Sequence, residues 1–240
     1  MRDKLIVLGA DFFARDCTEL APDLVGKLIV RRVGDEELIL RITETEAYCG
    51  ESDTACHASK GRTARTEMLY REAGTIYVYL CYGIHWLFNI ISGETEQPQG
   101  VLIRACEKYD GPAKLTKYLK IDKSLNGLSV IGNPEIFIAD DGFRPVIERR
   151  KRVGIDYAAP KDRDALLRYA DSRTKDIISQ PRYDHFDTSP LDLSIIPYPE
   201  KKGKRFLQNN NLFTIFSVPD ASYSGKMHLT YQSLDSPKVC

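Results

Sequence analysis

Residues 38–48 read Leu-Ile-Leu-Arg-Ile-Thr-Glu-Thr-Glu-Ala-Tyr, an apolar stretch that runs directly into two carboxylates. Alternate side chains of a β-strand share a face, so the sequence predicts one mixed face. Its members are Leu38, Leu40, Ile42, Glu44, Glu46 and Tyr48. Carboxylates are rarely turned inward without partners, because removing them from water is costly. The stretch therefore indicates a chemical role for the glutamates, or else a strand that ends at Thr43 and leaves both glutamates in solvent.

The composition is typical of a globular protein, and 240 residues can bury one sizeable core. Basic and acidic side chains balance at 34 each, which taken alone speaks against a nucleic-acid partner. Acidic residues predominate over 1–100 and basic residues over 101–180, so a local basic surface is compatible with the sequence. Six cysteines without a secretory signal are typical of reduced thiols, and no apolar run approaches the roughly 20 residues of a membrane span. We expect an intracellular protein that does not enter a membrane.

Several secondary-structure elements can be expected from local patterns. Residues 75–92 favour a β-hairpin with Tyr82-Gly83 at its tip, because glycine supplies the positive φ of a tight reversal. Gly111-Pro112 predicts a helix start, with Leu115 and Leu119 on the buried side. A short helix capped by Thr18 and stopped by Gly26 is also expected, as is a helix over 160–170.

Two further segments differ in character from the rest. Residues 49–74 contain few aliphatic side chains and predict a long functional loop. Beyond Gln180 prolines become frequent, so we place a domain boundary there. Residues 1–180 would form the catalytic domain, and residues 181–240 an ordered appendage, because their many large apolar side chains must be covered.

The pattern alone leaves the chemistry of the glutamates open. Two carboxylates on one strand face could activate a water molecule as a general base, or could act as the pair of a glycosidase. A zinc site built from Cys49, Cys56 and His57 is disfavoured, because the C-x-x-C spacing is absent. No metal or other cofactor is expected. Tyr82 is the aromatic least suited to the core, and an exposed aromatic tip can serve as a wedge between stacked bases.

Taken together, these residues resemble the alkyladenine (methylpurine) DNA glycosylase family. The matches cover about residues 8–180 in order and spacing, and they are specific as a set. They are Glu44-Thr45-Glu46-Ala47-Tyr48, Ala55, His57, Gly61-Arg62-Thr63, Arg65, the run from Gly74 to Gly83, Asn89, the run from Val101 to Ala105, Asp110-Gly111-Pro112, Lys114-Leu115 and the run from Arg152 to Ile155.

The resemblance implies an α+β fold: a single main domain around a curved antiparallel sheet, with a protruding hairpin that wedges into DNA. It implies an enzyme that flips damaged purines out of double-stranded DNA, acts as a monomer, and works where DNA is held, in the cytoplasm or nucleus. By resemblance, Glu46 is the general base and Arg104 steadies its water; Tyr82 is the DNA wedge. The base pocket would comprise Tyr48, Ala55, His57, Tyr79, Asn89 and Leu102. Contacts to the DNA backbone would come from Arg62, Arg65, Lys114 and Lys117.

The chain departs from the family pattern at a few positions. The family usually has Asn where Thr66 stands, a change that bears on a hydrogen bond in the loop, and Trp86 and Leu87 alter the second strand of the hairpin. Residues 181–240 match nothing in the family. Two other hypotheses remain open: a non-catalytic module that binds damaged DNA, and a hydrolase of small nucleosides or glycosides, which would need neither Tyr82 nor the basic loop.

Overall fold

The computed structural model describes residues 5–173, 204–208, 211–215 and 230–232. The chain divides into two compact units, Met1–Ile196 and Pro197–Cys240. The second unit contains a three-stranded antiparallel sheet formed by β10 (Lys204–Gln208), β11 (Asn211–Ile215) and β12 (Thr230–Gln232). The boundary expected after Gln180 lies outside the described residues, so it stays a prediction.

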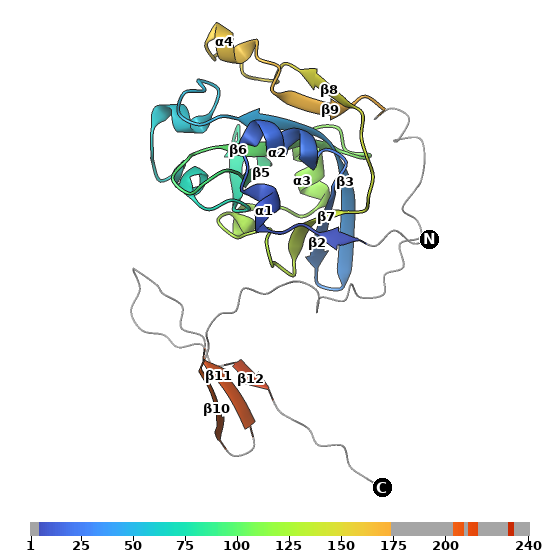
Figure 1. The fold of residues 1–240 in the computed structure, drawn as a ribbon, viewed down its shortest axis with the longest axis vertical. Coiled ribbons are helices and arrows are strands. Elements are labelled where there is room, and N and C mark those ends of the chain that lie inside the picture. The colour runs from blue at the N-terminus through green and yellow to red at the C-terminus, as the bar shows by residue number, and fades with distance from the viewer. Residues whose placement is uncertain (1–4, 174–203, 209–210, 216–229, 233–240) are drawn as a thin grey trace. The chain divides into compact units, whose positions relative to one another are not determined.

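The first unit is built around a curled antiparallel sheet with few helices, which confirms the expected α+β class (Figure 1). Its main path runs β1 (Ile6–Val7), β7 (Ile136–Asp140), β2 (Leu28–Val33), β3 (Glu36–Tyr48), β6 (Gly100–Cys106), β5 (His85–Ile91) and β4 (Ile76–Cys81). The C-terminal half of β3 also pairs with β9 (Arg168–Asp171), which in turn pairs with β8 (Ile147–Arg150). The strand from Glu36 to Tyr48 therefore lies at the centre of the sheet.

Short helices cover one face of this sheet. They are α1 (Ala10–Phe13), α2 (Cys17–Leu24) and α3 (Pro112–Tyr118), with α4 (Pro160–Arg163) beside β8 and β9. Phe13 and Leu20 join the main core, as do Leu115 and Leu119, which confirms the expected buried side of α3. Within the described part of the chain, no helix is both long and apolar enough to cross a bilayer.

A paired irregularity in β3 and β6 changes which residues face the core. The register runs Ile42↔Cys106, Glu44↔Ala105 and Thr45↔Ile103, so each strand accommodates one extra residue and the two then return to their original register. Such bulges interrupt the alternation of side chains. The core-facing residues are Leu40, Ile42 and Ala47 on β3, and Val101, Ile103 and Cys106 on β6. The prediction of one shared face from Leu38 to Tyr48 is therefore wrong, because the irregularity turns the glutamates to the opposite side.

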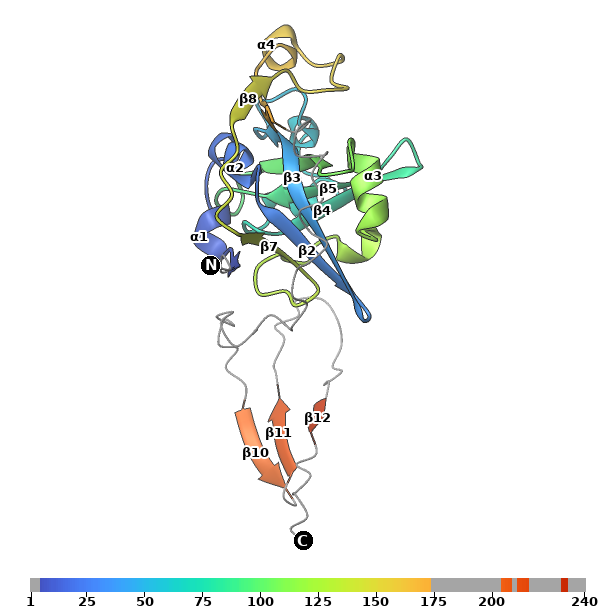
Figure 2. The ribbon, with the colours of Figure 1, turned by 90° about the vertical axis from the view of Figure 1, so that its right-hand side faces the viewer.

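The predicted hairpin is confirmed. β4 and β5 pair from Ile76↔Ile90 to Cys81↔His85, and Tyr82 and Gly83 both have positive φ at the tip. The outer edge of β4 is covered by main chain, since Ile76 exchanges hydrogen bonds with Leu128 and Gly127. Figure 2 shows the hairpin projecting from the sheet beyond α3.

Two other expectations are only partly confirmed. Residues 160–170 form only the single turn of α4, and the chain then becomes β9, because the free edge of β3 offers hydrogen bonds that outweigh local helix preference. The short helix expected before Gly26 is present as α2, and Gly26 follows its end with a positive φ, but its N-cap is Asp16 rather than Thr18: the Asp16 carboxylate accepts the Thr18 N–H at 2.8 Å.

Candidate active site

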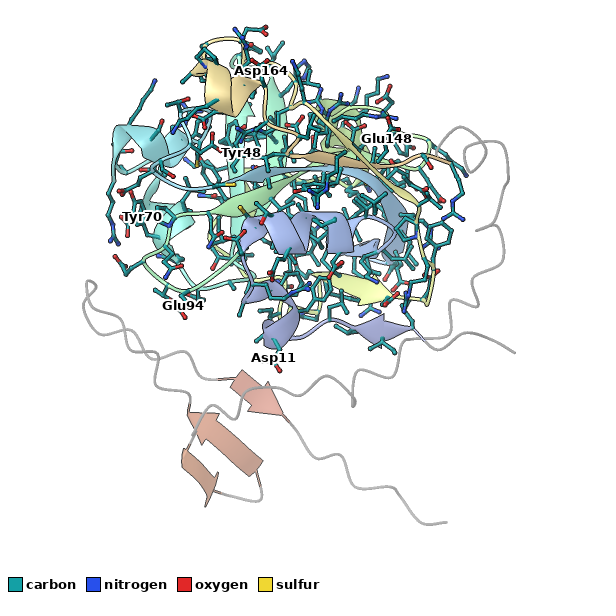
Figure 3. The ribbon with its side chains drawn as sticks, turned by 45° about the horizontal axis from the view of Figure 1, so that its top comes forward. Asp11, Tyr48, Tyr70, Glu94, Glu148 and Asp164 are labelled. Atoms are coloured by element: carbon teal, nitrogen blue, oxygen red, sulfur yellow. The ribbon has the colours of Figure 1, made fainter. Side chains whose placement is uncertain are left out.

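A cavity of about 600 Å³ opens between the end of β3, the β4–β5 hairpin, β6 and the loop around Gly154. It lies on the face of the sheet that the paired irregularity exposes. Figure 3 shows Tyr48 on the side of the unit that also carries α4 and Asp164. The cavity brings together every residue expected for catalysis and base binding, namely Glu46, Tyr48, Ala55, His57, Tyr79, Asn89, Leu102 and Arg104.

Glu46 is fully buried, yet it borders the cavity. Its Oε1 accepts the backbone N–H of Val153 at 2.9 Å, and its Oε2 accepts the Tyr48 hydroxyl at the same distance. The Arg104 Nε lies 3.5 Å from Oε1. These three contacts fix the carboxylate in one orientation, as a group that must act on a positioned water requires.

Burial raises the pKa of Glu46 above its ordinary value. Arg104 opposes this rise, as do the Val153 N–H and the Tyr48 hydroxyl, because each favours the charged form. Burial and the neighbouring carboxylate also raise the pKa of Tyr48, so its hydroxyl stays protonated and can donate to Glu46. Glu46 therefore has a raised affinity for a proton and still keeps its hydrogen-bond partners.

Glu44 lies near the same Arg104 as Glu46, but its main partner is a different arginine. Its Oε1 accepts Arg168 Nη1 at 2.8 Å and lies 3.8 Å from Arg104 Nε. Glu44 does not line the cavity. The two glutamates thus have different surroundings, which disfavours the paired-carboxylate glycosidase hypothesis, in which both groups must flank one bond.

Aromatic rings form one wall of the cavity. The rings of His57 and Tyr79 meet at 4.7 Å between centroids, and the Tyr77 hydroxyl lies 3.0 Å from His57 Nδ1. Burial lowers the pKa of His57 to about 4, with Arg65 and Lys60 contributing, so the ring is neutral near pH 7. A neutral ring can stack on a flat heterocycle without repelling one that carries positive charge.

Asn89 and Leu87, both on the second strand of the hairpin, complete the cavity floor. Asn89 Nδ2 donates to the Tyr77 carbonyl across the hairpin at 3.0 Å, which holds its side chain in the floor. Leu87 also lines the cavity, whereas Trp86 contributes its main-chain carbonyl to the Thr116 hydroxyl at 2.9 Å. Of the two departures, only Leu87 therefore changes the cavity surface.

A buried ion pair supports the wall at Tyr48. Arg152 binds Asp53 through two hydrogen bonds of 2.5 and 2.9 Å and donates to the Ala47 carbonyl. Its guanidinium carbon lies 4.8 Å from the centre of the Tyr48 ring. The pair ties the loop after β3 to the segment after β8, and so fixes Tyr48 from behind.

Thr66 stands where the family usually has asparagine, and its hydroxyl forms hydrogen bonds within the loop. Its hydroxyl accepts the Thr63 N–H at 2.8 Å and reaches the Gly61 carbonyl at 3.0 Å. The loop of residues 61–66 is therefore closed by hydrogen bonds of the Thr66 hydroxyl, although this side chain is shorter than asparagine.

The residues expected at the DNA backbone lie in different settings. Arg65 lines the cavity with its guanidinium over the Tyr79 ring, while Arg62 pairs with Glu67 and Glu96. Lys117 lies in the last turn of α3. Tyr82 is 90% exposed at the hairpin tip and borders the cavity.

Sequence reasoning assigned no role to three groups that meet the site: the Val153 N–H, Arg168 and Tyr157. The run Arg152-Val153-Gly154-Ile155 was a visible signal, but nothing local indicates that its main chain contacts Glu46. The described residues contain no cluster of three His, Cys, Asp or Glu side chains suited to hold a metal. The cavity therefore offers a carboxylate, two arginines and a wall of aromatic rings as its chemical groups.

The comparisons with known proteins agree on one family of proteins. A family model described as methylpurine-DNA glycosylase matches residues 11–111 and 107–175. A protein of Psychrobacter cryohalolentis, provisionally named 3-methyladenine DNA glycosylase, is 41% identical over 193 residues, covering 68% of this chain and 91% of the relative. Similar proteins of the same provisional name occur in Natranaerobius thermophilus, 42% identical over 175 residues (63% and 88% covered), and in Clostridium perfringens, 39% identical over 193 residues (68% and 94% covered).

Proposed function

Because the chain belongs to the methylpurine-DNA glycosylase family, and is thus a DNA glycosylase of DNA repair, we propose that it is monofunctional and flips its target purine out of duplex DNA. Its substrates would be alkylated or deaminated purines of the 3-methyladenine, 7-methylguanine, hypoxanthine and ethenoadenine class. Hydrolysis of the N-glycosidic bond would leave an abasic site.

The observation that carries the proposal is the setting of Glu46. Its carboxylate is buried, fixed by three contacts and part of the cavity lining. In the proposed reaction it takes a proton from water, the water oxygen bonds to C1′, and the bond from C1′ to the purine nitrogen breaks with its electrons leaving on the base. An electron-poor purine is already a good leaving group, so one positioned base can suffice. Arg104 would hold the water and the neighbouring phosphate.

The walls of the cavity fit a flat base. Tyr48, His57 and Tyr79 would stack on the extruded purine, and Ala55 and Leu102 would complete the pocket. The Asn89 side chain donates to the Tyr77 carbonyl and is held in place by it. It would disfavour normal guanine sterically, because it would meet the exocyclic amino group of that base. The residues lining the cavity, all in the described part of the chain, include no lysine that could attack C1′ as an amine, which supports attack by water.

The hairpin tip would fill the space that the base vacates. Tyr82 is exposed, and its backbone takes a positive φ of 50° in the turn at the tip. An aromatic inserted at that position offsets part of the unstacking cost, which is a few kcal/mol per step. Arg65, Lys114 and Lys117 would contact phosphates, and Arg62 could do so by exchanging its carboxylate partners for them.

The test is an excision assay on the full chain as a monomer in EDTA. Duplex oligonucleotides would carry hypoxanthine, ethenoadenine or 7-methylguanine opposite a normal partner, and abasic sites would be cleaved and counted. We expect excision of at least one lesion without added metal. Tight binding without abasic sites would instead support a non-catalytic damaged-DNA module, and release of base from free nucleosides alone would support a small-molecule hydrolase.

A further inference from the structure

The loop from Val153 to Ala158 is fixed on both sides of the cavity mouth. Its first residue donates the N–H that Glu46 accepts. Ile155 and Ala158 pack with Ala55 and with the partly buried Tyr48. A loop held in this way has a defined position relative to the catalytic carboxylate, so a side chain that it presents at the mouth is also positioned.

Tyr157 is the aromatic side chain that this loop presents. It is 69% exposed and borders the cavity, although its hydroxyl already donates to the Ala55 carbonyl at 3.1 Å. The Tyr82 phenol is close enough to contribute to raising the pKa of Tyr157, after burial as the main cause. The two tyrosines therefore border the same mouth, one from the hairpin and one from this loop, and both elements project to the same side in Figure 2.

We propose that the ring of Tyr157 packs on the deoxyribose of the extruded nucleotide and holds its C1′ near Glu46, an inference that rests on the proposed function. The sugar must lie beside this loop, because Glu46 acts on C1′ and accepts a hydrogen bond from the same loop. A ring whose hydroxyl is already bound offers its face to the C–H groups of the sugar at little entropic cost.

The test compares Tyr157→Ala with the ring-retaining variant Tyr157→Phe in single-turnover excision of hypoxanthine, paired in a duplex or unpaired in a one-nucleotide bulge. Tyr157→Ala should lower the excision rate at least tenfold on both substrates, because the ring is proposed to act after the nucleotide has been extruded. Tyr157→Phe keeps the ring and should excise at a rate within about threefold of wild type. Leu166→Ala, which removes an exposed apolar side chain outside the cavity, serves as the control.

A loss confined to the paired substrate would overturn the proposal and place Tyr157 with the wedge. So would Tyr157→Ala excising at the wild-type rate, or Tyr157→Phe losing as much activity as Tyr157→Ala, since the hydroxyl anchor would then be the important feature. If wild type excised no lesion at all, the proposed function would fail first, and the two failures are thus distinguishable.

A second, independent observation concerns two thiols behind the cavity wall. Cys17, the first residue of α2, is fully buried, and its thiol donates to the sulfur of Cys49 at 3.3 Å. Cys49 is only partly buried and directly follows Tyr48 at the end of β3. The Cys17 hydrogen bond lowers the pKa of Cys49, and nearby Arg152 contributes. A partly exposed sulfur with enhanced thiolate character beside a second thiol is a typical oxidisable pair.

We infer that Cys17 and Cys49 form a reversible disulfide when a peroxide oxidises the protein. The Cys49 thiolate attacks one peroxide oxygen and becomes a sulfenic acid; the O–O bond breaks and releases hydroxide, which takes up a solvent proton to give water. The Cys17 sulfur then attacks the sulfenic sulfur, and its proton passes to the departing hydroxide, so that the disulfide forms and a second water leaves. Because an S–S bond is about 2.05 Å long, the sulfurs must approach by more than 1 Å, and the adjacent Tyr48 must adjust. Displacements of that size in an active site can cost about a hundredfold in rate.

The full chain would be treated with hydrogen peroxide and mapped by mass spectrometry, with excision measured before and after reduction by dithiothreitol. We expect a Cys17–Cys49 cross-link, at least a tenfold loss of excision, and recovery on reduction. Cys49→Ser should keep basal excision and resist peroxide, and Cys106, which is buried without a sulfur partner in the described chain, should remain unmodified. A wild-type protein that never cross-links would overturn the inference, and so would a cross-link that leaves excision unchanged.

Discussion

The backbone N–H of Val153 donates to Oε1 of Glu46 across 107 residues of sequence. The carboxylate that we propose as the general base thus depends on a main-chain group of a distant loop. Any substitution at Val153 other than proline leaves that donor in place, so the role of Glu46 is best tested at Glu46 itself.

Glu46→Gln should abolish excision, while lesion-duplex binding stays within about tenfold of wild type, because the carboxylate serves the reaction more than ground-state affinity. Single-turnover excision and fluorescence anisotropy would measure the two effects. The matched control is Glu44→Gln, two residues away and bound to Arg168. An inactive Glu44→Gln beside an active Glu46→Gln would show that the general base is assigned to the wrong glutamate.

The pH profile should show an acid limb above the ordinary glutamate pKa of 4.5, because burial raises the pKa of Glu46 and the base acts only when deprotonated. Excision of hypoxanthine should fall as the pH drops through that raised value. Arg104→Met should move the limb to higher pH, since Arg104 opposes the rise. His57, with its pKa near 4, should add no transition between pH 5 and 8. A limb at or below 4.5 would contradict this account.

Glu46→Gln should also raise the melting temperature near neutral pH. The folded protein disfavours the ionised carboxylate, so wild-type stability declines as the pH rises from 4.5 through the raised pKa, and glutamine avoids that loss. The difference between variant and wild type should therefore grow from pH 4.5 to 7.5, by a few degrees for each 1 kcal/mol. Thermal melts at several pH values would measure it. Glu44→Gln, which loses an ion pair, should show no such gain; a difference independent of pH would count against burial as the cause.

Tyr82→Ala should slow excision most on fully paired lesions and least on bulged ones, which are already partly unstacked. Fluorescence of ethenoadenine, together with single-turnover rates, would separate extrusion from hydrolysis. Val146→Ala removes an exposed apolar side chain before β8 and should behave as wild type. An equal loss on every substrate, single-stranded DNA included, would indicate a folding role for Tyr82.

Asp53→Asn should destabilise the fold strongly, by about 3–5 kcal/mol, because it leaves the buried Arg152 guanidinium without its carboxylate. Urea unfolding followed by fluorescence would measure the change. Glu36→Gln breaks an exposed ion pair with Lys120 and should have little effect. Equal effects of the two changes would mean that the Arg152 pair does not fix the loop behind Tyr48.

The sequence predicted the hairpin, the start of α3 and the set of residues that converge on the cavity, because each of these is encoded in local spacing or in a run of matched motifs. It did not predict that α4 ends after one turn or that β9 follows it, because the edge of β3 that pairs with β9 lies more than a hundred residues earlier in the chain. For the same reason Arg168 went unnoticed as the partner of Glu44. Thr66 illustrates the reverse: the departure was visible, but only the geometry shows that a hydroxyl makes the loop hydrogen bonds.

The alternation of side chains along β3 is interrupted once, between Ile42 and Thr45. Because of this interruption Glu46 faces the cavity and not the hydrophobic core. Because β3 and β6 each carry one extra residue, the two strands stay in register while both exchange faces. If both strands kept every residue but alternated strictly, Glu46 would turn into the hydrophobic core and Ala47 out of it. Deleting Thr43 alone would leave the extra residue of β6 without its counterpart and break the match between the strands. A deletion of one residue in each strand would keep both the pairing and the faces of Glu46 and Ala47, so changes of length at this point are compatible with the fold and the reaction only when they occur in both strands together.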